Sequence, residues 1–252
     1  MAAPCGAALG NSKTMKKHSS STVRRRACLL LAACGSAEPR EQGPQAGDFE
    51  MRSLAKSDIG QVLEVHVSEL RGHLEALMLK LYKRNPRELR KTPGATAEGN
   101  VTRLLARSDD WKFPELQERI GVQAIHLGLT PEFTGDRVFA FIAGLASMLM
   151  AAYEYKTEFY VLDTVDAQNL YNSARNIEIA AWKLEHSLDD AGRPYLYSVS
   201  LQGEPENLSY ERLFGKMIAL QDTMAVIIAD RTNRTVRKVI QRMATAAFLP
   251  IF

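Results

Sequence analysis

The stretch VFAFIAGLASMLMAAY, residues 138–153, decides the fold of this chain, because none of its sixteen residues carries a charge. It is too short for an ordinary membrane-spanning helix, which needs about 20 apolar residues. A helix that is apolar on every side is buried by its neighbours, so this stretch is predicted to be the central helix of a bundle. Small residues at spacings of three and four should let another helix approach it closely: Ala140, Gly144, Ser147 and Ala151.

Apolar residues recur at helical spacing on both sides of this stretch. Ser57 is the predicted N-cap of the first helix, and Asn85 followed by Pro86 is its predicted stop. The predicted helices cover residues 58–84, 101–107, 114–127, 164–188 and 209–247, with a loop at 92–100 and, as an alternative, a break near 230–235. The predicted fold class is therefore mainly α, a helical bundle with a central apolar helix.

One segment has the pattern of a strand. Residues 195–201 alternate between Tyr, Val or Leu on one side and smaller or polar residues on the other. Residues 158–165 are a candidate partner, so a small β-hairpin beside the helices stays open as an alternative.

The N-terminal region has the order of a secretion signal. Residues 27–33 form a short apolar run, the sequence Leu-Ala-Ala-Cys-Gly closes it at 31–35, and the basic residues that come first are Lys16, Lys17, Arg24, Arg25 and Arg26. This arrangement resembles the leader and lipobox of bacterial lipoproteins.

The resemblance implies that residues 1–33 are a signal peptide and that Cys34 is the first residue of the mature chain. In that family the cysteine thiol carries a diacylglycerol thioether, so Cys34 would be the lipid anchor. The implied location is the bacterial cell envelope, facing the periplasm, at the outer membrane in preference to the inner one. Met15 is an alternative start, which would leave residues 1–14 outside the protein. The basic run is also compatible with a twin-arginine signal, or with a basic N-terminus on a cytoplasmic protein.

Three regions follow from this cut. After the signal peptide, residues 34–49 hold the lipidated cysteine and a tether, because residues 35–47 are rich in Gly, Pro and polar side chains. Such a coil spans about 20 Å on average. Residues 50–252 are predicted to form a single helical domain.

Charge and cysteine usage exclude several functions. The net charge of +3 comes from the leader, since six of the 32 basic residues and none of the 29 acidic residues precede Cys34. The remaining chain is net negative, so bulk charge gives no support for nucleic-acid binding. All three cysteines lie at or before position 34, which excludes thiolate metal sites and cysteine nucleophiles from the domain. No cofactor is predicted.

His66, Glu69 and His73 are the nearest approach to a metal cluster. The two histidines are separated by about 10 Å along one helix, which is too far for both to bind one ion. No metal site is therefore predicted, and the three residues are interpreted as lying at the edge of an apolar stripe.

Two polar groups form a candidate pocket. Carboxylates among aromatic residues can do acid and base work if one of them is desolvated, and a row of buried amides can bind a ligand or fix the packing between helices. Lys156 favours the alternative that the carboxylates lie on a solvated helix edge. The candidate residues are Glu154, Glu158, Asp163, Asn169, Asn172 and Asn176.

A basic stripe is the candidate interaction surface. If its segment is helical, Val236 and Ile240 lie opposite a basic face, and such a helix can lie on anionic lipid or dock on an acidic partner. A solvated basic face on a core-packed helix is the alternative. The apolar ending at 246–252 is predicted to pack on something. The stripe consists of Arg231, Arg234, Arg237, Lys238 and Arg242.

These observations predict an envelope lipoprotein whose periplasmic domain acts as a binding or scaffolding module. Its expected partners are the membrane, through the lipid anchor, and an envelope protein. No catalytic residue is predicted, and catalysis is the less favoured interpretation. The alternatives are a tethered enzyme or small-ligand carrier with a pocket near 153–166, and a cytoplasmic helical regulator.

Overall fold

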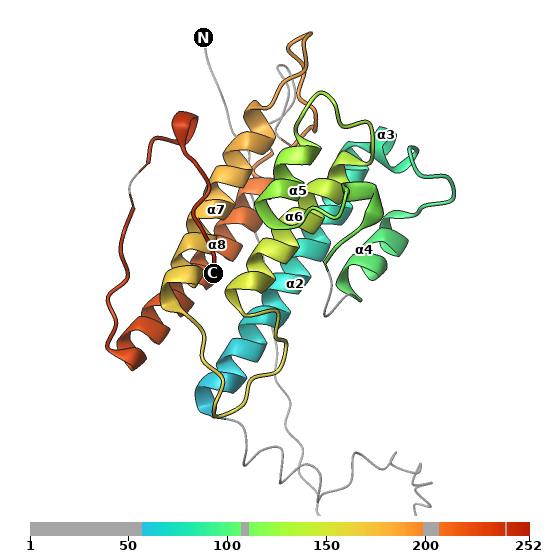
Figure 1. Ribbon diagram of the computed structural model, residues 1–252. Coiled ribbons are helices and arrows are strands. Elements are labelled where there is room, and N and C mark those ends of the chain that lie inside the picture. The colour runs from blue at the N-terminus through green and yellow to red at the C-terminus, as the bar shows by residue number, and fades with distance from the viewer. Residues whose placement is uncertain (1–56, 107–110, 199–206, 240) are drawn as a thin grey trace, which may run out of the picture. The chain divides into compact units, whose positions relative to one another are not determined.

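Four long helices alternate in direction and form the core of the domain in the computed structural model, which describes residues 57–106, 111–198, 207–239 and 241–252 (Figure 1). They are α2 (Asp58–Arg84), α6 (Arg137–Ala152), α7 (Ala167–His186) and α8 (Ser209–Thr232). Among these four, each packs on two others, since α2 and α7 both contact α6 and α8. The shorter elements are α3 (Pro86–Leu89), α4 (Ala97–Leu105), α5 (Gly121–Gly128) and the 3-10 turns η1 (Pro114–Leu116) and η2 (Met243–Thr245). The predicted helical bundle is confirmed.

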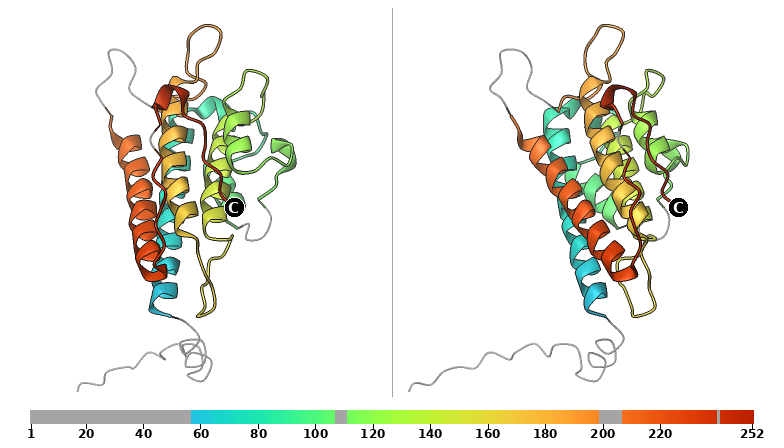
Figure 2. Two further views of the ribbon diagram at one scale, coloured as in Figure 1. Left: turned by 60° about the vertical axis from the view of Figure 1, so that its left-hand side comes forward. Right: turned by 90° about the vertical axis from the view of Figure 1, so that its left-hand side faces the viewer.

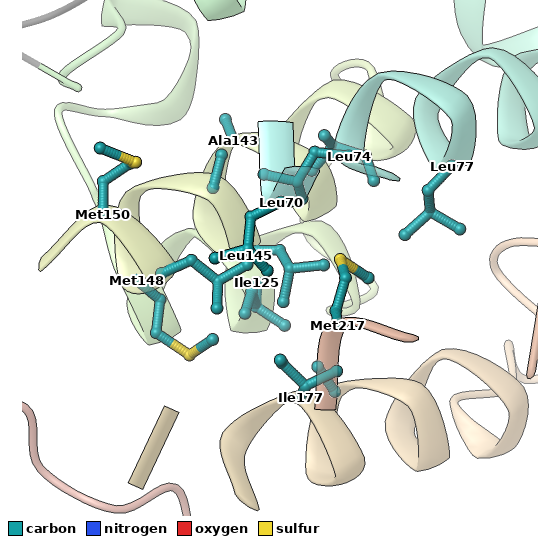
Figure 3. Packing of buried hydrophobic residues seen from close by; sticks show 14 of the residues in the cluster. Leu70, Leu74, Leu77, Ile125, Ala143, Leu145, Met148, Met150, Ile177 and Met217 are labelled. Atoms are coloured by element: carbon teal, nitrogen blue, oxygen red, sulfur yellow. The ribbon is translucent and has the colours of Figure 1, made fainter. Parts of the chain in front are cut away.

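The central helix is α6. Every residue of α6 except Ala151 is buried, as the charge-free sequence predicts. Its side chains meet residues of α2, α5, α7 and α8, of which Leu70, Ile125, Ile177 and Met217 lie around Leu145 and Met148 (Figure 3). Among the described residues, no helix has both the length and the apolar character that crossing a bilayer requires.

The close approach that small residues predict on α6 is made by α5. A Cβ added at Gly144 would lie 2.6 Å from the carbonyl oxygen of Gly121 and equally close to the amide nitrogen of Ile125. The hydroxyl of Ser147 accepts a hydrogen bond from the Gly121 amide at 2.8 Å. The row of small residues on α6 is therefore the surface on which α5 packs.

Two of the shorter predicted helices have wrong boundaries. Helix α4 begins at Ala97, inside the predicted loop, because the hydroxyl of Thr96 caps it by accepting from Gly99 N at 3.0 Å. The predicted helix at 114–127 is split, because Gln117 and Glu118 take left-handed conformations with φ of 54° and 58°. By contrast, α2 begins after Ser57 and ends before Pro86 as predicted.

The strand predicted at 195–201 is absent over its described part, residues 195–198, and the proposed partner at 158–165 is not a strand. A single antiparallel bridge joins Leu188 and Pro194 instead. The side chain of Asn85 takes the place of a partner strand, because it accepts from Tyr197 N and donates to Tyr197 O.

The helix predicted to run to residue 247 ends at Thr232, inside the range 230–235 where the sequence offered a break as the alternative. Asn233 adopts a left-handed conformation with φ of 51°, and residues 234–239 continue without helix. The basic amphipathic helix predicted there does not form, because α7 supplies side-chain partners for the backbone of Arg237 and Val239. These tertiary contacts outweigh the helical pattern of the segment.

Candidate functional site

A row of three asparagines on α7 is the candidate functional site. Asn169, Asn172 and Asn176 are buried on one face of this helix. The helix begins there because the carboxylate of Asp166 caps it, accepting from Gln168 N at 2.7 Å and Asn169 N at 3.1 Å. Asparagine is a weak helix former, so its use three times on one face needs a reason outside the helix.

The reason is the backbone of residues 249–252, which lies against the row. Asn176 makes two hydrogen bonds to Leu249, donating to its carbonyl at 2.8 Å and accepting from its amide at 2.6 Å. Asn169 makes a similar pair with Phe252, accepting from its amide at 3.2 Å and donating to its main-chain oxygen. Asn172 donates to the carbonyl of Pro250 at 2.8 Å, and a proline has no amide proton to offer in return.

The spacing of the row matches an extended chain. Asn169 and Asn176 are seven residues apart, which is about 10.5 Å along an α-helix. Leu249 and Phe252 are three residues apart, which is about 10 Å along an extended chain. Asparagines at this spacing on a helix can therefore contact an extended peptide without straining either partner. We call Asn169, Asn172 and Asn176 the amide row.

A second extended segment binds the other flank of α7. Gln168 accepts from Arg237 N at 2.7 Å and donates to Arg237 O at 3.1 Å, and the hydroxyl of Tyr171 accepts from Val239 N at 3.2 Å. The C-terminal region therefore runs along α7 in one direction and returns in the other, on either side of the helix (Figure 2).

A cavity of about 280 Å³ lies between α7 and this region, bordered by Tyr171, Arg175, Glu178, Val239 and Met243 among others. Arg175 closes one side by pairing with Glu178 at 2.9 Å and with Asp222 of α8 at 2.7 Å. Partial burial raises the pKa of Glu178, although Arg175 opposes part of the rise. Polar side chains border the cavity from both sides, Arg175 and Glu178 from α7 and Lys238 and Gln241 from the C-terminal region.

The predicted carboxylates lie apart from the amide row. Lys156 pairs with Glu154 and with Asp163, each at 2.8 Å, and Glu158 accepts from the hydroxyl of Tyr160. The hydrogen bond from Lys156 lowers the pKa of Asp163, opposite to what a general acid requires. Glu154 and Glu158 are exposed, as the solvated-edge interpretation has it, but they lie in the turn after α6 and not on a helix.

The five residues of the predicted basic stripe share no helical face. Arg231 lies in the last turn of α8, Arg234 pairs with Asp166 at 3.4 Å, and Arg237 is held by Gln168 through its backbone. Lys238 borders the cavity and Arg242 precedes η2.

His66, Glu69 and His73 border a shallow depression between α2 and α8. Burial lowers the pKa of His66. Within the described part of the chain, no group of three His, Cys, Asp or Glu side chains is placed to hold a metal ion. The predicted lipidation site, Cys34, lies outside the described residues.

The sequence did not predict which segment binds to the amide row. It identified the amide row but not its occupant, and it did not identify Gln168 or Tyr171. One available signal was the apolar ending at 246–252, which is predicted to pack on something and which supplies the backbone that the row binds.

No family model, curated protein or solved structure matches this chain.

Proposed function

We propose that this protein is a binding module that recognises an extended polypeptide through its backbone, and that Cys34 holds it at the bacterial envelope. One observation carries the binding part: two asparagines of the amide row each make a donor and an acceptor contact with one residue of an extended chain. Backbone amides and carbonyls are common to all sequences, so such a row binds by conformation more than by side-chain identity.

Residues 247–252 act in this proposal as a ligand that the chain supplies to itself. A ligand on the same chain is present at an effective concentration in the millimolar range for short connections. A segment from another protein must displace it. An envelope protein with an exposed extended segment is the partner that fits this chemistry, and the module has no catalytic role.

A peptide of residues 246–252, labelled at its N-terminus, tests the binding part by fluorescence anisotropy. The chain lacking residues 247–252 should bind the peptide at least tenfold more tightly than the intact chain. The same truncated chain with Asn169, Asn172 and Asn176 changed to alanine should not bind it. If the truncated chain keeps its helical circular dichroism and still fails to bind, the proposal is wrong.

The location part rests on the basic, apolar and small residues that end in Cys34. The intact mass of protein from the native host should show a chain that begins at Cys34 and carries acyl chains. Cys34→Ala should abolish labelling with a radioactive fatty acid. Unacylated native chain that retains Met15 would refute the anchor and leave the peptide-binding result untouched.

A further inference from the structure

The turn between α6 and α7 ends in an exposed apolar tip. Leu162 is 93% exposed, Val161 is 58% exposed and Tyr160 is 39% exposed, although the chain buries most of its other large apolar side chains. We call residues 160–162 the apolar tip. One exposed leucine needs no explanation, but three consecutive apolar residues at the end of a turn do.

The tip is held firmly by the bundle. Phe159 precedes it and is fully buried, with its ring centroid 6.3 Å from that of Tyr153. Phe159 N donates to the carboxylate of Glu64 at 3.0 Å, and a Cβ at Gly60 would lie 2.8 Å from Phe159 O. Gly60 lies in the first turn of α2, so the tip lies at the end of the bundle where α2 begins (Figure 1).

This is also the end at which the chain enters the bundle, because Ser57 is the N-cap of α2 and the predicted tether precedes it in the sequence. A chain held on a membrane through Cys34, as the proposed function has it, is therefore linked to the bilayer at the end that carries the tip. The opposite end of the bundle is separated from this end by the length of α2, which is about 40 Å for 27 residues.

We infer that the apolar tip inserts into the interfacial region of a lipid bilayer and orients the domain on the membrane. Leucine and valine partition into the acyl boundary, and a tyrosine ring is suited to the headgroup level. The turn from 153 to 166 contains four carboxylates and one lysine, so its charge does not favour anionic lipid. Insertion is therefore driven by apolar burial and should not need anionic headgroups.

The experiment uses the full chain with Cys5, Cys28 and Cys34 changed to serine and with an N-terminal hexahistidine tag. The tag holds it on phosphatidylcholine vesicles that contain a nickel-chelating lipid, so the result does not depend on acylation of Cys34. An environment-sensitive nitrobenzoxadiazole label is placed at Leu162→Cys or, as the matched control, at Ala191→Cys. Ala191 is exposed in the turn that follows α7, whereas the tip precedes α7, so the two labels lie at opposite ends of that helix.

On vesicles the label at 162 should brighten at least threefold and be quenched by nitroxide-bearing lipids, while the label at 191 should change little. Adding Val161→Glu should reduce the effect at 162. In unlabelled chain, amide exchange of residues 159–163 should slow on vesicles. Equal emission at 162 in solution and on vesicles, with sedimentation showing that the chain is bound, overturns the inference. Brightening that appears only with anionic lipid also overturns it.

Discussion

The packing of α5 on α6 depends on the absence of a side chain at Gly144. The backbone of α5 occupies the space that a Cβ would need, with atoms of Gly121 and Ile125 within 2.6 Å. Helix α5 cannot move away cheaply, because the hydroxyl of Ser147 holds its first amide. A methyl group at this position must therefore displace one helix from another.

Gly144→Ala should lower the free energy of unfolding by about 3 kcal/mol, the cost of overpacking a close contact. Gly215→Ala in α8 is the matched control, since a Cβ there meets nothing within 4 Å. That change should raise stability by about 0.5–1 kcal/mol, because alanine is the better helix former. Urea denaturation of both variants measures the difference, and equal effects would contradict the packing described.

Asn176 shows the same dependence for a polar residue. Asn176→Ala removes both partners of Leu249, so the amide of Leu249 should exchange with solvent at least tenfold faster. The free energy of unfolding should fall by about 1–3 kcal/mol if residues 249–252 stay in place with unpaired groups. Gln123→Ala, at an exposed amide of α5, is the control and should leave exchange at Leu249 unchanged.

At the scale of elements, the start of α6 is joined to α2 and α3 by a polar cluster. Asp136 caps α6 by accepting from Phe139 N at 2.9 Å, and it accepts from the hydroxyl of Tyr82 at 2.7 Å. Glu88 is buried in α3 and pairs with Lys91 at 2.6 Å. Burial raises the pKa of Asp136, and the charge of Glu88 adds to the rise.

This cluster predicts a pH dependence of stability. Because the pKa of Asp136 is higher in the folded chain than its ordinary value of 3.8, the folded chain binds the proton more tightly than the unfolded chain. The stabilisation that comes from protonated Asp136 is fully present below pH 3.8. It is lost as the pH rises through the raised pKa that Asp136 has in the folded chain. Asp136→Asn should therefore show a smaller loss of stability over that window than the unchanged chain. Parallel slopes for the two proteins, measured by urea denaturation at several pH values, would contradict this.

The C-terminal region is a part whose secondary structure the sequence predicted wrongly. The pattern at 233–247 does resemble an amphipathic helix, but Asn233 turns the chain and Gln168, far away in sequence, binds the next segment. Helical periodicity reports only local preference, and here partners on α7 decide the outcome. The same reasoning explains why the amide row could be predicted as polar and buried, while its occupant could not.

For the whole molecule, a buried hydrogen-bond chain fixes how three helices are placed. The hydroxyl of Tyr153, next to α6, donates to Gln221 of α8 at 2.6 Å, and Gln221 donates to Ser173 of α7 at 2.6 Å. All three side chains are buried. A buried network that is fully satisfied favours one packing arrangement over others.

Gln221→Leu should lower the free energy of unfolding by about 2 kcal/mol, because the hydroxyl of Tyr153 loses its partner in the core. Tyr153→Phe in the same chain should recover part of that loss, since it removes the unpaired hydroxyl. A double-mutant cycle by thermal or urea denaturation measures the coupling, and strictly additive losses would show that the chain of bonds does not act as a unit.

The overall architecture could be predicted from the sequence. The uncharged stretch at 138–153, the spacing of leucines on α2 and the small residues on α6 predict the central helix, one long neighbour and a close helix contact, which α5 makes. Contacts between segments that are distant in sequence could not be predicted, because a linear pattern does not contain them. The pairing of Asn85 with Tyr197 and of Asn176 with Leu249 are two such contacts.

The buried position of α6 has a consequence for the chain when it is not folded. Sixteen uncharged residues without a proline, protected only by the other helices, form a segment that can self-associate once the bundle opens. Arg137 and Glu154 flank the segment, but nothing charged interrupts it. Heating should therefore lead to aggregation more readily than to reversible unfolding. In the cell, each opening of the bundle that exposes α6 should carry the same risk of aggregation.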